Sequence, residues 1–294
     1  MRHNNIKNSL LKKLLRIIFR NISKQLVGTG ISKNRTVYNF VEFMKEKIKE
    51  DFVIVDGCKL LLDKTDRHGF TIYGEEDHIE RELIKKIVRP GDVTIDVGAN
   101  IGYHTVVMAK IVGKTGHVYA FEPSPYNVEL LKKTMELNGF QNVSVIHKAV
   151  SEQPGKSFLY FSNGISAHSL TNFGYNNGGI EVSIDSLDNF FKDLDKKINF
   201  VKIDAEGYDF KVIRGMKNIL KTPNLKLLIE FFPERLKKTG ESPKEFLEFL
   251  FENQFNVIDL KKNKPLTVND VNEIVRIYDS PPPDHMTNFF CEKI

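Results

Sequence analysis

Asp96, Glu122 and Asp204 each lie at the end of a short run rich in β-branched and aromatic residues, the composition of a buried strand. Ligands of open α/β sheets bind beyond the carboxyl ends of the strands, so these carboxylates are expected near a ligand. A carboxylate there can accept hydrogen bonds from hydroxyl groups, attract a cation or act as a general base. These positions therefore predict the binding of a polar ligand together with a proton transfer.

A glycine-containing turn follows Asp96. Its sequence from Gly98 to Gly102 lacks the middle glycine of the dinucleotide fingerprint and the Gly-Lys-Ser/Thr of a phosphate-binding loop. Asn100, inside the turn, tolerates a left-handed backbone. Glu122 stands 20 residues after Gly102, where nucleotide-binding folds place the acidic residue that binds ribose hydroxyls. The spacing predicts a site for a nucleoside without phosphate. S-adenosylmethionine has these properties, and its ammonium group suits Asp96.

Two carboxylates and one histidine are candidates for a catalytic base. A sugar or alcohol hydroxyl is a poor nucleophile at neutral pH, so a base within hydrogen-bond reach is useful. Asp204 is the first candidate and Glu206 the second, with the alternative that Glu206 caps a helix beginning near Tyr208. His168 lies in a long polar loop where an acceptor could meet it. A cation held by Asp204, Glu206 and Glu230 has thin support, and no metal site is predicted.

Strands and helices alternate from residue 78 onward, the pattern of a parallel sheet with helices on both faces. The core strands are expected at 93–97, 117–122, 143–147, 200–204, 225–231, 255–260 and 288–292, and the helices at 78–88, 126–138, 208–220 and 243–253. Two added strands, 157–161 and 181–184, flank a Ser/Asn/Gly-rich loop that is typical of a lid or binding loop. Before residue 78 we expect a helix at 36–50 and short strands at 52–55, 60–62 and 70–73.

The charge of the chain is unevenly distributed. Residues 1–41 contain nine Lys/Arg and no Asp/Glu, leaving 34 of the 43 basic residues against all 38 acidic ones. The body therefore has no bulk attraction for nucleic acid, and no nucleic-acid partner is expected. Residues 9–24 have the pattern of a basic amphipathic helix. This helix has three possible binding surfaces: its own domain, a sister subunit in a homo-oligomer, or an anionic membrane surface.

Both cysteines, Cys58 and Cys291, are isolated in the sequence. Without a CxxC pair or a His/Cys cluster, neither a disulfide framework nor a structural zinc site is expected. A reducing compartment fits best, which indicates a cytoplasmic location with a peripheral membrane contact as the alternative.

The sequence resembles the FkbM family of S-adenosylmethionine-dependent methyltransferases. The blocks that carry the resemblance occur in the family's order and are 96–103, 121–125, 148–151, 183–188 and 201–207. The resemblance implies a class I methyltransferase (Rossmann-like) fold, α/β with helices on both faces. Its seven-stranded sheet would have the order 3-2-1-4-5-7-6 and an antiparallel strand seven. We expect this domain at residues 78–294, preceded by a helical and short-strand extension at 1–77.

Carried over residue by residue, the resemblance implies a cofactor site for S-adenosyl-L-methionine. Its positions are Asp96, Gly98, Asn100 and Gly102 at the methionine end, Glu122 at the ribose, and Pro123, Ser124 and Ala149 around the adenine. The activity that it implies is O-methylation of a hydroxyl on a glycan, sugar or other small metabolite. The alternatives are an NAD-dependent oxidoreductase, which the missing middle glycine argues against, and a non-catalytic adenosine-binding scaffold of the same fold.

Overall fold

The computed structural model describes residues 15, 18, 35–64, 66, 69–73, 78–162, 168–279 and 285–294. The helix expected at 9–24 thus lies outside the described residues, apart from Leu15 and Ile18. Within the described ranges, no helix is both long enough and apolar enough to cross a bilayer.

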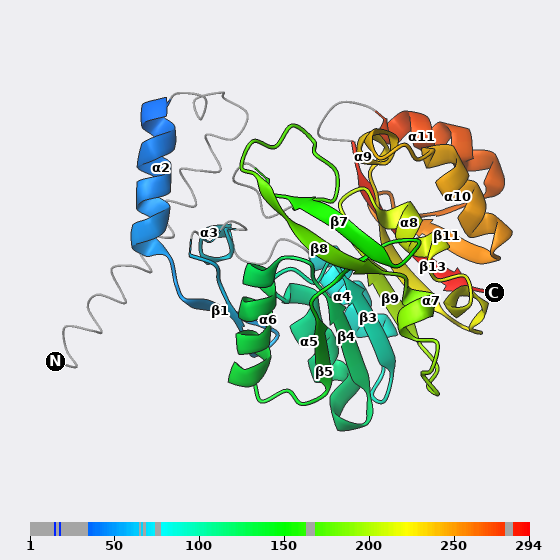
Figure 1. The fold of residues 1–294 in the computed structure, drawn as a ribbon, viewed down its shortest axis with the longest axis horizontal. Helices are drawn as coiled ribbons and strands as arrows, with labels where there is room; N and C mark the ends of the chain where they lie inside the picture. Colours follow the sequence, from blue (N-terminus) through cyan, green and yellow to red (C-terminus); the bar gives the residue numbers. More distant parts are fainter. Residues whose placement is uncertain are drawn as a thin grey trace.

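The core is one twisted, mostly parallel sheet of eight strands (Figure 1). Its order is β12-β11-β13-β10-β9-β3-β4-β5, in which β13 runs antiparallel to both neighbours. Seven of these strands have the predicted order with an antiparallel strand seven, so that prediction is confirmed, and β12 is one strand more than expected. The strands are β3 (Val93–Val97), β4 (His117–Phe121), β5 (Val143–Ile146), β9 (Phe200–Ile203), β10 (Lys226–Phe231), β11 (Phe255–Asp259), β12 (Lys264–Leu266) and β13 (Thr287–Lys293).

Two apolar clusters cover the two faces of this sheet because the side chains of each strand alternate between them. One face packs on α7 (Leu187–Phe190), α8 (Asp209–Arg214), α10 (Pro243–Glu252) and α11 (Val271–Tyr278), with α9 (Pro233–Lys238) beside them. The other packs on α4 (His78–Ile87), α5 (Tyr103–Val112) and α6 (Pro125–Leu137).

The segment before α4 packs against this second face. Helix α2 (Arg35–Ile48) leads into a hairpin of β1 (Phe52–Val55) and β2 (Cys58–Leu61), whose inward side chains join the cluster around α5. Because α4, β1 and β2 all contact α5, this helix is buried on nearly every side. The hairpin therefore belongs to the hydrophobic core that supports the glycine turn in front of α5.

A second sheet is inserted between β5 and β9. Strands β6 (Ala149–Val150), β8 (Gly179–Asp185) and β7 (Gly155–Tyr160) pair in that order, with β7 and β8 antiparallel. Tyr160 and Ser169 exchange backbone hydrogen bonds at 2.8 and 3.2 Å. This pairing brings the start of the long loop back over the main sheet.

Two of the expected elements were wrong. Phe70–Tyr73, predicted as a strand, forms the helical turn α3, because the Asp66 carboxylate accepts the backbone N–H groups of Phe70 and Thr71 at 3.0 and 2.9 Å. The helix expected through 220 ends at Arg214. A Cβ on the next residue, Gly215, would lie 2.3 Å from the Ser151 carbonyl oxygen, so glycine is required for this close approach.

Candidate active site

The turn between β3 and α5 is shaped by backbone contacts that require glycine. The N–H groups of Gly98 and Ala99 both donate to the Phe121 carbonyl at 3.0 Å, which ties the turn to β4. Gly98 has a φ of +75°, and a Cβ there would lie 1.9 Å from the Asp204 carbonyl oxygen. At Gly102, a Cβ would lie 2.4 Å from Leu131. The turn is thus wedged between β4 and the segment after β9.

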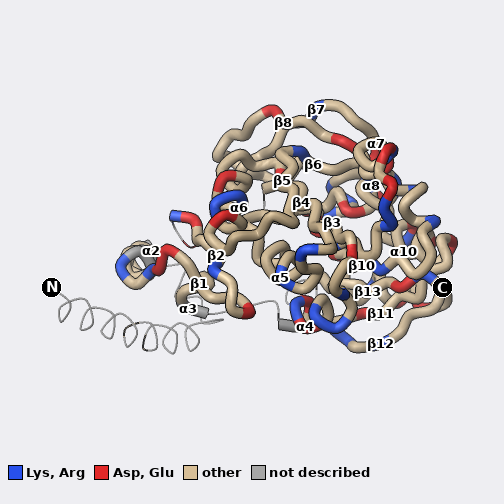
Figure 2. Tube along the Cα trace, turned by 90° about the horizontal axis from the view of Figure 1, so that it is seen from below, with Lys and Arg blue, Asp and Glu red and all other residues tan. Residues whose placement is uncertain are grey.

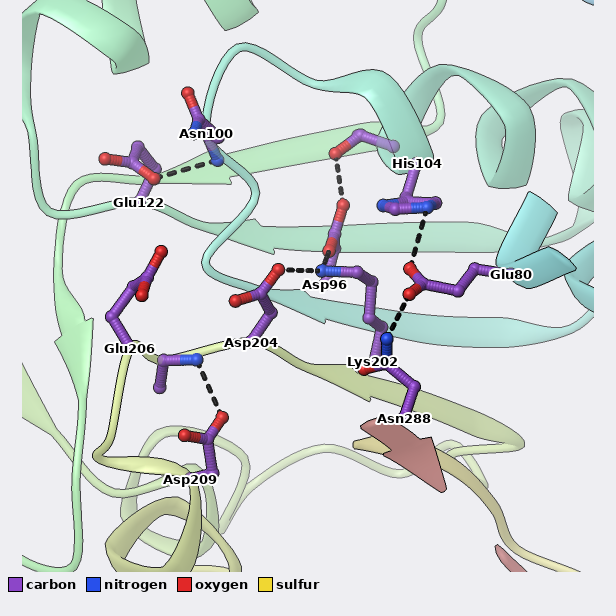
Figure 3. Close-up of polar contacts among 12 residues, drawn as sticks. Glu80, Asp96, Asn100, His104, Glu122, Lys202, Asp204, Glu206, Asp209 and Asn288 are labelled. Carbon is purple, nitrogen blue, oxygen red and sulfur yellow. Dashed lines mark hydrogen bonds and ion pairs between the residues drawn. The ribbon is translucent and has the colours of Figure 1, made fainter. Parts of the chain in front are cut away.

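Glu122 anchors this turn from the end of β4. Its carboxylate accepts the backbone N–H of Asn100 at 2.8 Å (Figure 3). It also accepts the backbone N–H of Ser124 at 2.9 Å and the side-chain amide of Asn127 at 3.3 Å. Burial raises the pKa of Glu122 to about 7, against the opposing effect of these donors. Sequence reasoning missed Asn127, whose only signal is its place in the first turn of the helix after Glu122.

Asp96 is fully buried behind the turn. Its Oδ2 accepts the Thr105 hydroxyl at 2.6 Å, whereas Oδ1 has no hydrogen-bond partner among the described residues and lies 4.0 Å from the Lys202 ammonium. Burial raises the pKa of Asp96, and Lys202 opposes that shift. The Oδ1 atom of Asn100 is likewise buried and lacks a hydrogen-bond partner in the described part of the chain. Both oxygens are acceptors available to a ligand or an ordered water.

Lys202 lies on β9, paired in register with Asp96 on β3. Its ammonium is buried and donates to Asp204 Oδ2 at 3.1 Å (Figure 3). Burial by itself would lower the Lys202 pKa, but the carboxylates of Asp204, Asp96 and Glu80 outweigh it and raise the pKa above its ordinary value. Lys202 was not predicted, although a lysine in an otherwise apolar strand was a usable signal.

Asp204 and Glu206 both reach the cleft but are held differently. The Asp204 side chain is 41% exposed, and its Oδ2 accepts the hydrogen bond from the buried Lys202 ammonium. Glu206 has a left-handed φ of 52° and forms an ion pair with Arg235. Neither caps the following helix. The N-cap residue of that helix is Tyr208, with no side-chain cap hydrogen bond. Asp209, the first helical residue, instead holds the preceding loop, because its carboxylate accepts the N–H groups of Ala205 at 2.8 Å and Gly207 at 3.0 Å.

Asp209 itself is buried, and its pKa rises to about 6 through burial and the nearby Asp204 charge. The alternative interpretation of Glu206 as the helix cap was wrong, because no side chain caps the N-terminus of α8 and Glu206 pairs with Arg235 instead. Glu230, considered as a metal ligand, is buried beneath this loop rather than in the cleft wall. Over the described ranges, no cluster of three His, Cys, Asp or Glu side chains is placed to hold a metal ion.

A cleft of about 930 Å³, including the part open to solvent, brings most of the predicted residues together. Three predicted cofactor residues, Asp96, Gly102 and Ser124, lie behind its wall. His168 reaches the wall from the long loop, with its Nδ1 accepting the Ser162 N–H at 3.3 Å. The predicted residues in the wall are Gly98, Asn100, Glu122, Pro123, Ala149, His168, Asp204 and Glu206.

The chemistry of this wall fits an adenosine carrying an amino acid. Glu122 offers a carboxylate for hydroxyl groups. The buried acceptor oxygens of Asn100 in the wall and of Asp96 behind it would suit an ammonium. Phe121 and Val150 provide an apolar surface against which the adenine ring could pack. The sequence of the turn itself, 98–102, contains no lysine or arginine that could bind a phosphate.

Residues 96–257 match the methyltransferase FkbM domain, which is more than half of the chain. The chain is 28% identical over 192 residues to the hexuronic acid methyltransferase AglP of Haloferax volcanii, covering 65% of this chain and 74% of that protein. It is 42% identical over 59 residues to a protein-L-isoaspartate O-methyltransferase of Methanothrix thermoacetophila. That match covers 20% of this chain and only 28% of the relative's length.

Among solved structures, an FkbM methyltransferase from Methylobacillus flagellatus aligns with a TM-score of 0.43 at 14% identity, covering 77% of this chain and 52% of that chain. The family match spans the glycine turn, Glu122 and the loop from Asp204 to Asp209. This chain therefore belongs to the methyltransferase FkbM family.

Proposed function

We propose that this protein methylates a hydroxyl oxygen of a sugar, with a uronic acid as the first acceptor to test. The observation that carries the proposal is the Asp204 carboxylate. It is partly open to the cleft, its other side is fixed by buried Lys202, and it shares the cleft with Glu122. Methyl transfer to a hydroxyl needs a base close to the acceptor and a second group that holds the nucleoside of the cofactor. Asp204 and Glu122 would fill these two roles.

The cofactor supplies an electrophilic methyl group on a sulfonium. Asp204 would take the proton from the acceptor hydroxyl as its oxygen attacks that methyl carbon, so that a C–O bond forms and the C–S bond breaks. Lys202 orients Asp204 through its 3.1 Å hydrogen bond. Glu206 is the second candidate for the base. Its carboxylate forms an ion pair with Arg235, which makes it a weaker proton acceptor than Asp204 in this proposal.

Three groups would hold the cofactor. Glu122 would accept the ribose hydroxyls with the oxygen lone pairs that its protein donors leave available. Asp96 Oδ1 and Asn100 Oδ1 would accept from the ammonium, directly or through water. Ala149 and Pro123, in the wall of the same cleft, would border the adenine.

The uronic acid is suggested by the similarity to AglP, a hexuronic acid methyltransferase. The acceptor would enter beside His168, Leu170 and Tyr208, which line the cleft near Asp204 and Glu206. His168 would lie close enough to this entrance to contact the acceptor rather than the cofactor.

Calorimetry with S-adenosylmethionine and with NAD, on the wild type and Glu122→Ala, tests the cofactor. We expect S-adenosylmethionine to bind and Glu122→Ala to weaken it. Binding of NAD alone would overturn the assignment in favour of an oxidoreductase.

Transfer of a labelled methyl group to glucuronic and galacturonic acid glycosides, with the matching neutral glycosides as controls, tests the acceptor. We expect labelled ether products that disappear in Asp204→Asn while cofactor binding persists. Cofactor binding without transfer to any hydroxyl in the panel would contradict the proposal and favour a non-catalytic scaffold or another acceptor.

A further inference from the structure

Large apolar side chains are exposed on the N-terminal segment far more than elsewhere. Of the eleven such side chains exposed among the described residues, five lie before residue 55. Four of them surround the junction of α2 and β1, and we call these four the N-terminal apolar face. They are Phe40 (59% exposed), Phe43 (53%), Phe52 (38%) and Ile54 (53%).

This face is the outer side of elements whose inner side is packed. Phe40 and Phe43 are three residues apart and so lie on one side of α2, while Ile48 of the same helix is fully buried. Phe52 and Ile54 lie on one face of β1, and Val55 on the opposite face is fully buried. The segment is therefore anchored to the body by one side and leaves its other apolar side uncovered by the described residues.

Figure 1 shows α2 at the edge of the molecule, separated from the main sheet, and Figure 2 shows the same helix end-on at that edge, beside β1 and β2. None of the four side chains of the N-terminal apolar face lines the cleft, although Phe70 of α3, in the same segment of the chain, does.

Two lysines lie against these aromatic rings, within a segment, residues 35–64, that holds six Lys/Arg and six Asp/Glu. The Lys47 ammonium lies 5.4 Å from the centre of the Phe43 ring, and the Lys59 ammonium lies 5.2 Å from that of Phe52. A surface hollow at the base of α2 is lined by Lys49, Leu62, Lys64, Tyr126, Glu129, Leu130 and Lys133. The chain that leads into α2, residues 1–41, has nine basic residues and no acidic one.

From this combination we infer that the N-terminal apolar face docks on an anionic phospholipid surface. Aromatic side chains with lysines beside them are suited to the boundary between headgroups and acyl chains, where rings enter the apolar layer and ammonium groups meet phosphates. Each basic residue near an anionic leaflet adds to the attraction. Two of the three lysines of the hollow, Lys49 and Lys64, would contact lipid phosphates while the rings of Phe40 and Phe43 insert between the lipids.

The charge also distinguishes this occupant from a second copy of the chain. A symmetric dimer through the same face would bring two basic N-terminal segments together, each with nine positive charges in its first 41 residues. Like charges in one interface are repulsive, whereas an anionic membrane neutralises both charge and apolar exposure.

Co-sedimentation of the full chain with vesicles tests the inference independently of the methyl acceptor. The vesicles are phosphatidylcholine alone and phosphatidylcholine with about one-third phosphatidylglycerol. We expect binding to the anionic vesicles, weakened by added salt, and little binding to the neutral ones. Phe40→Ser with Phe43→Ser, and separately Lys49→Glu with Lys64→Glu, should each lower the partition coefficient at least about tenfold.

Matched variants on the body control for the loss of any phenylalanine or lysine. Phe158→Ser removes a similarly exposed ring (42%) from β7, and Lys192→Glu with Lys197→Glu reverses two exposed charges after α7. Both should bind vesicles like the wild type. Calorimetry with S-adenosylmethionine should give unchanged affinity in every variant, which shows that the fold is intact.

Three outcomes would overturn the inference. They are no binding to anionic vesicles, equal loss in the body variants, or unchanged binding when Phe40 and Phe43 are replaced. A dimer seen by light scattering that dissociates in the Phe40→Ser, Phe43→Ser variant, without vesicle binding, would assign the face to a second copy instead.

Discussion

Glu122 and Asp204 follow the two strands that flank β3, yet their carboxylates are held in different ways. Glu122 is buried and receives three N–H donors from the turn and from α6. Asp204 is 41% exposed and is held by the single ammonium of Lys202. On the cofactor side of the cleft, the carboxylate is thus held mainly by backbone N–H groups. On the acceptor side, the carboxylate is held by one side chain and stays accessible to a ligand.

Gly98→Ala should have the largest effect on stability. It disrupts the contact between Gly98 and the Asp204 carbonyl, where the cofactor side and the acceptor side of the cleft meet. The new Cβ would overlap the Asp204 carbonyl oxygen, in addition to the cost of a left-handed alanine. We expect a loss of at least about 4 kcal/mol in the free energy of unfolding, or failure to fold. Denaturant unfolding measures it.

Gly139→Ala is the matched control, since Gly139 has a φ of +69° and no atom within 4 Å of the position that a Cβ would occupy. Its expected cost is about 1–2 kcal/mol, that of the backbone conformation alone. Equal costs for the two variants would contradict the close contact at Gly98.

Asp204→Asn tests the acceptor side. Removing a general base should lower kcat about 10²–10⁴-fold, while the dissociation constant of S-adenosylmethionine changes little, because Asn still accepts the Lys202 hydrogen bond. Steady-state kinetics and calorimetry separate the two quantities. Glu206→Gln, the comparison variant, should retain most of the activity, and the reverse ranking would make Glu206 the base.

Glu122→Gln tests the cofactor side and should have the converse effect. We expect the affinity for S-adenosylmethionine to fall about 10–100-fold, the loss of one or two charge-assisted hydrogen bonds, with a smaller change in kcat at saturating cofactor. Loss of kcat alone would show that Glu122 acts on the acceptor side instead.

The same residue predicts a pH dependence. Because the pKa of Glu122 is about 7 in the folded protein against 4.5 ordinarily, cofactor affinity should decline as the pH falls below about 7 in the wild type and stay flat in Glu122→Gln. Its raised pKa also means that its contribution to folding stability is fully present below pH 4.5 and is lost as the pH rises through about 7. Calorimetry and denaturant unfolding at pH 5 and 8 check both.

Asp209→Ala should give the smallest of these changes. It removes the acceptor of two loop N–H groups, for an expected loss of about 1–3 kcal/mol in unfolding free energy. Asp188→Ala removes a comparable pair of acceptors, for the N–H groups of Asn218 and Ile219, outside the cleft wall. Both should be destabilised, but only Asp209→Ala should also lower kcat, because it releases the loop that carries Asp204.

Local pattern was sufficient for the parts of the chain whose conformation is decided within a few residues. The β-branched run before Asp96, the glycines after it and the spacing to Glu122 predicted the strand, the turn and the parallel sheet correctly. The same local pattern gave a wrong prediction at Phe70–Tyr73. Aromatic and β-branched residues favour a strand, but hydrogen bonds from Phe70 and Thr71 to the Asp66 carboxylate stabilise a helical turn there.

The local sequence by itself determined the glycine turn and which acidic residues end the strands, since these depend on periodicity and backbone freedom. The order of the sheet was implied by the resemblance to the FkbM family. Only the tertiary structure decided how the carboxylates are partnered. Lys202, on β9, reaches Asp204 and also Asp96 on the adjacent strand β3. Asp209 holds the loop before α8, and Asn127 reaches Glu122 from α6. Such contacts join residues whose distance in space is set by strand register and helix packing, which no local pattern records.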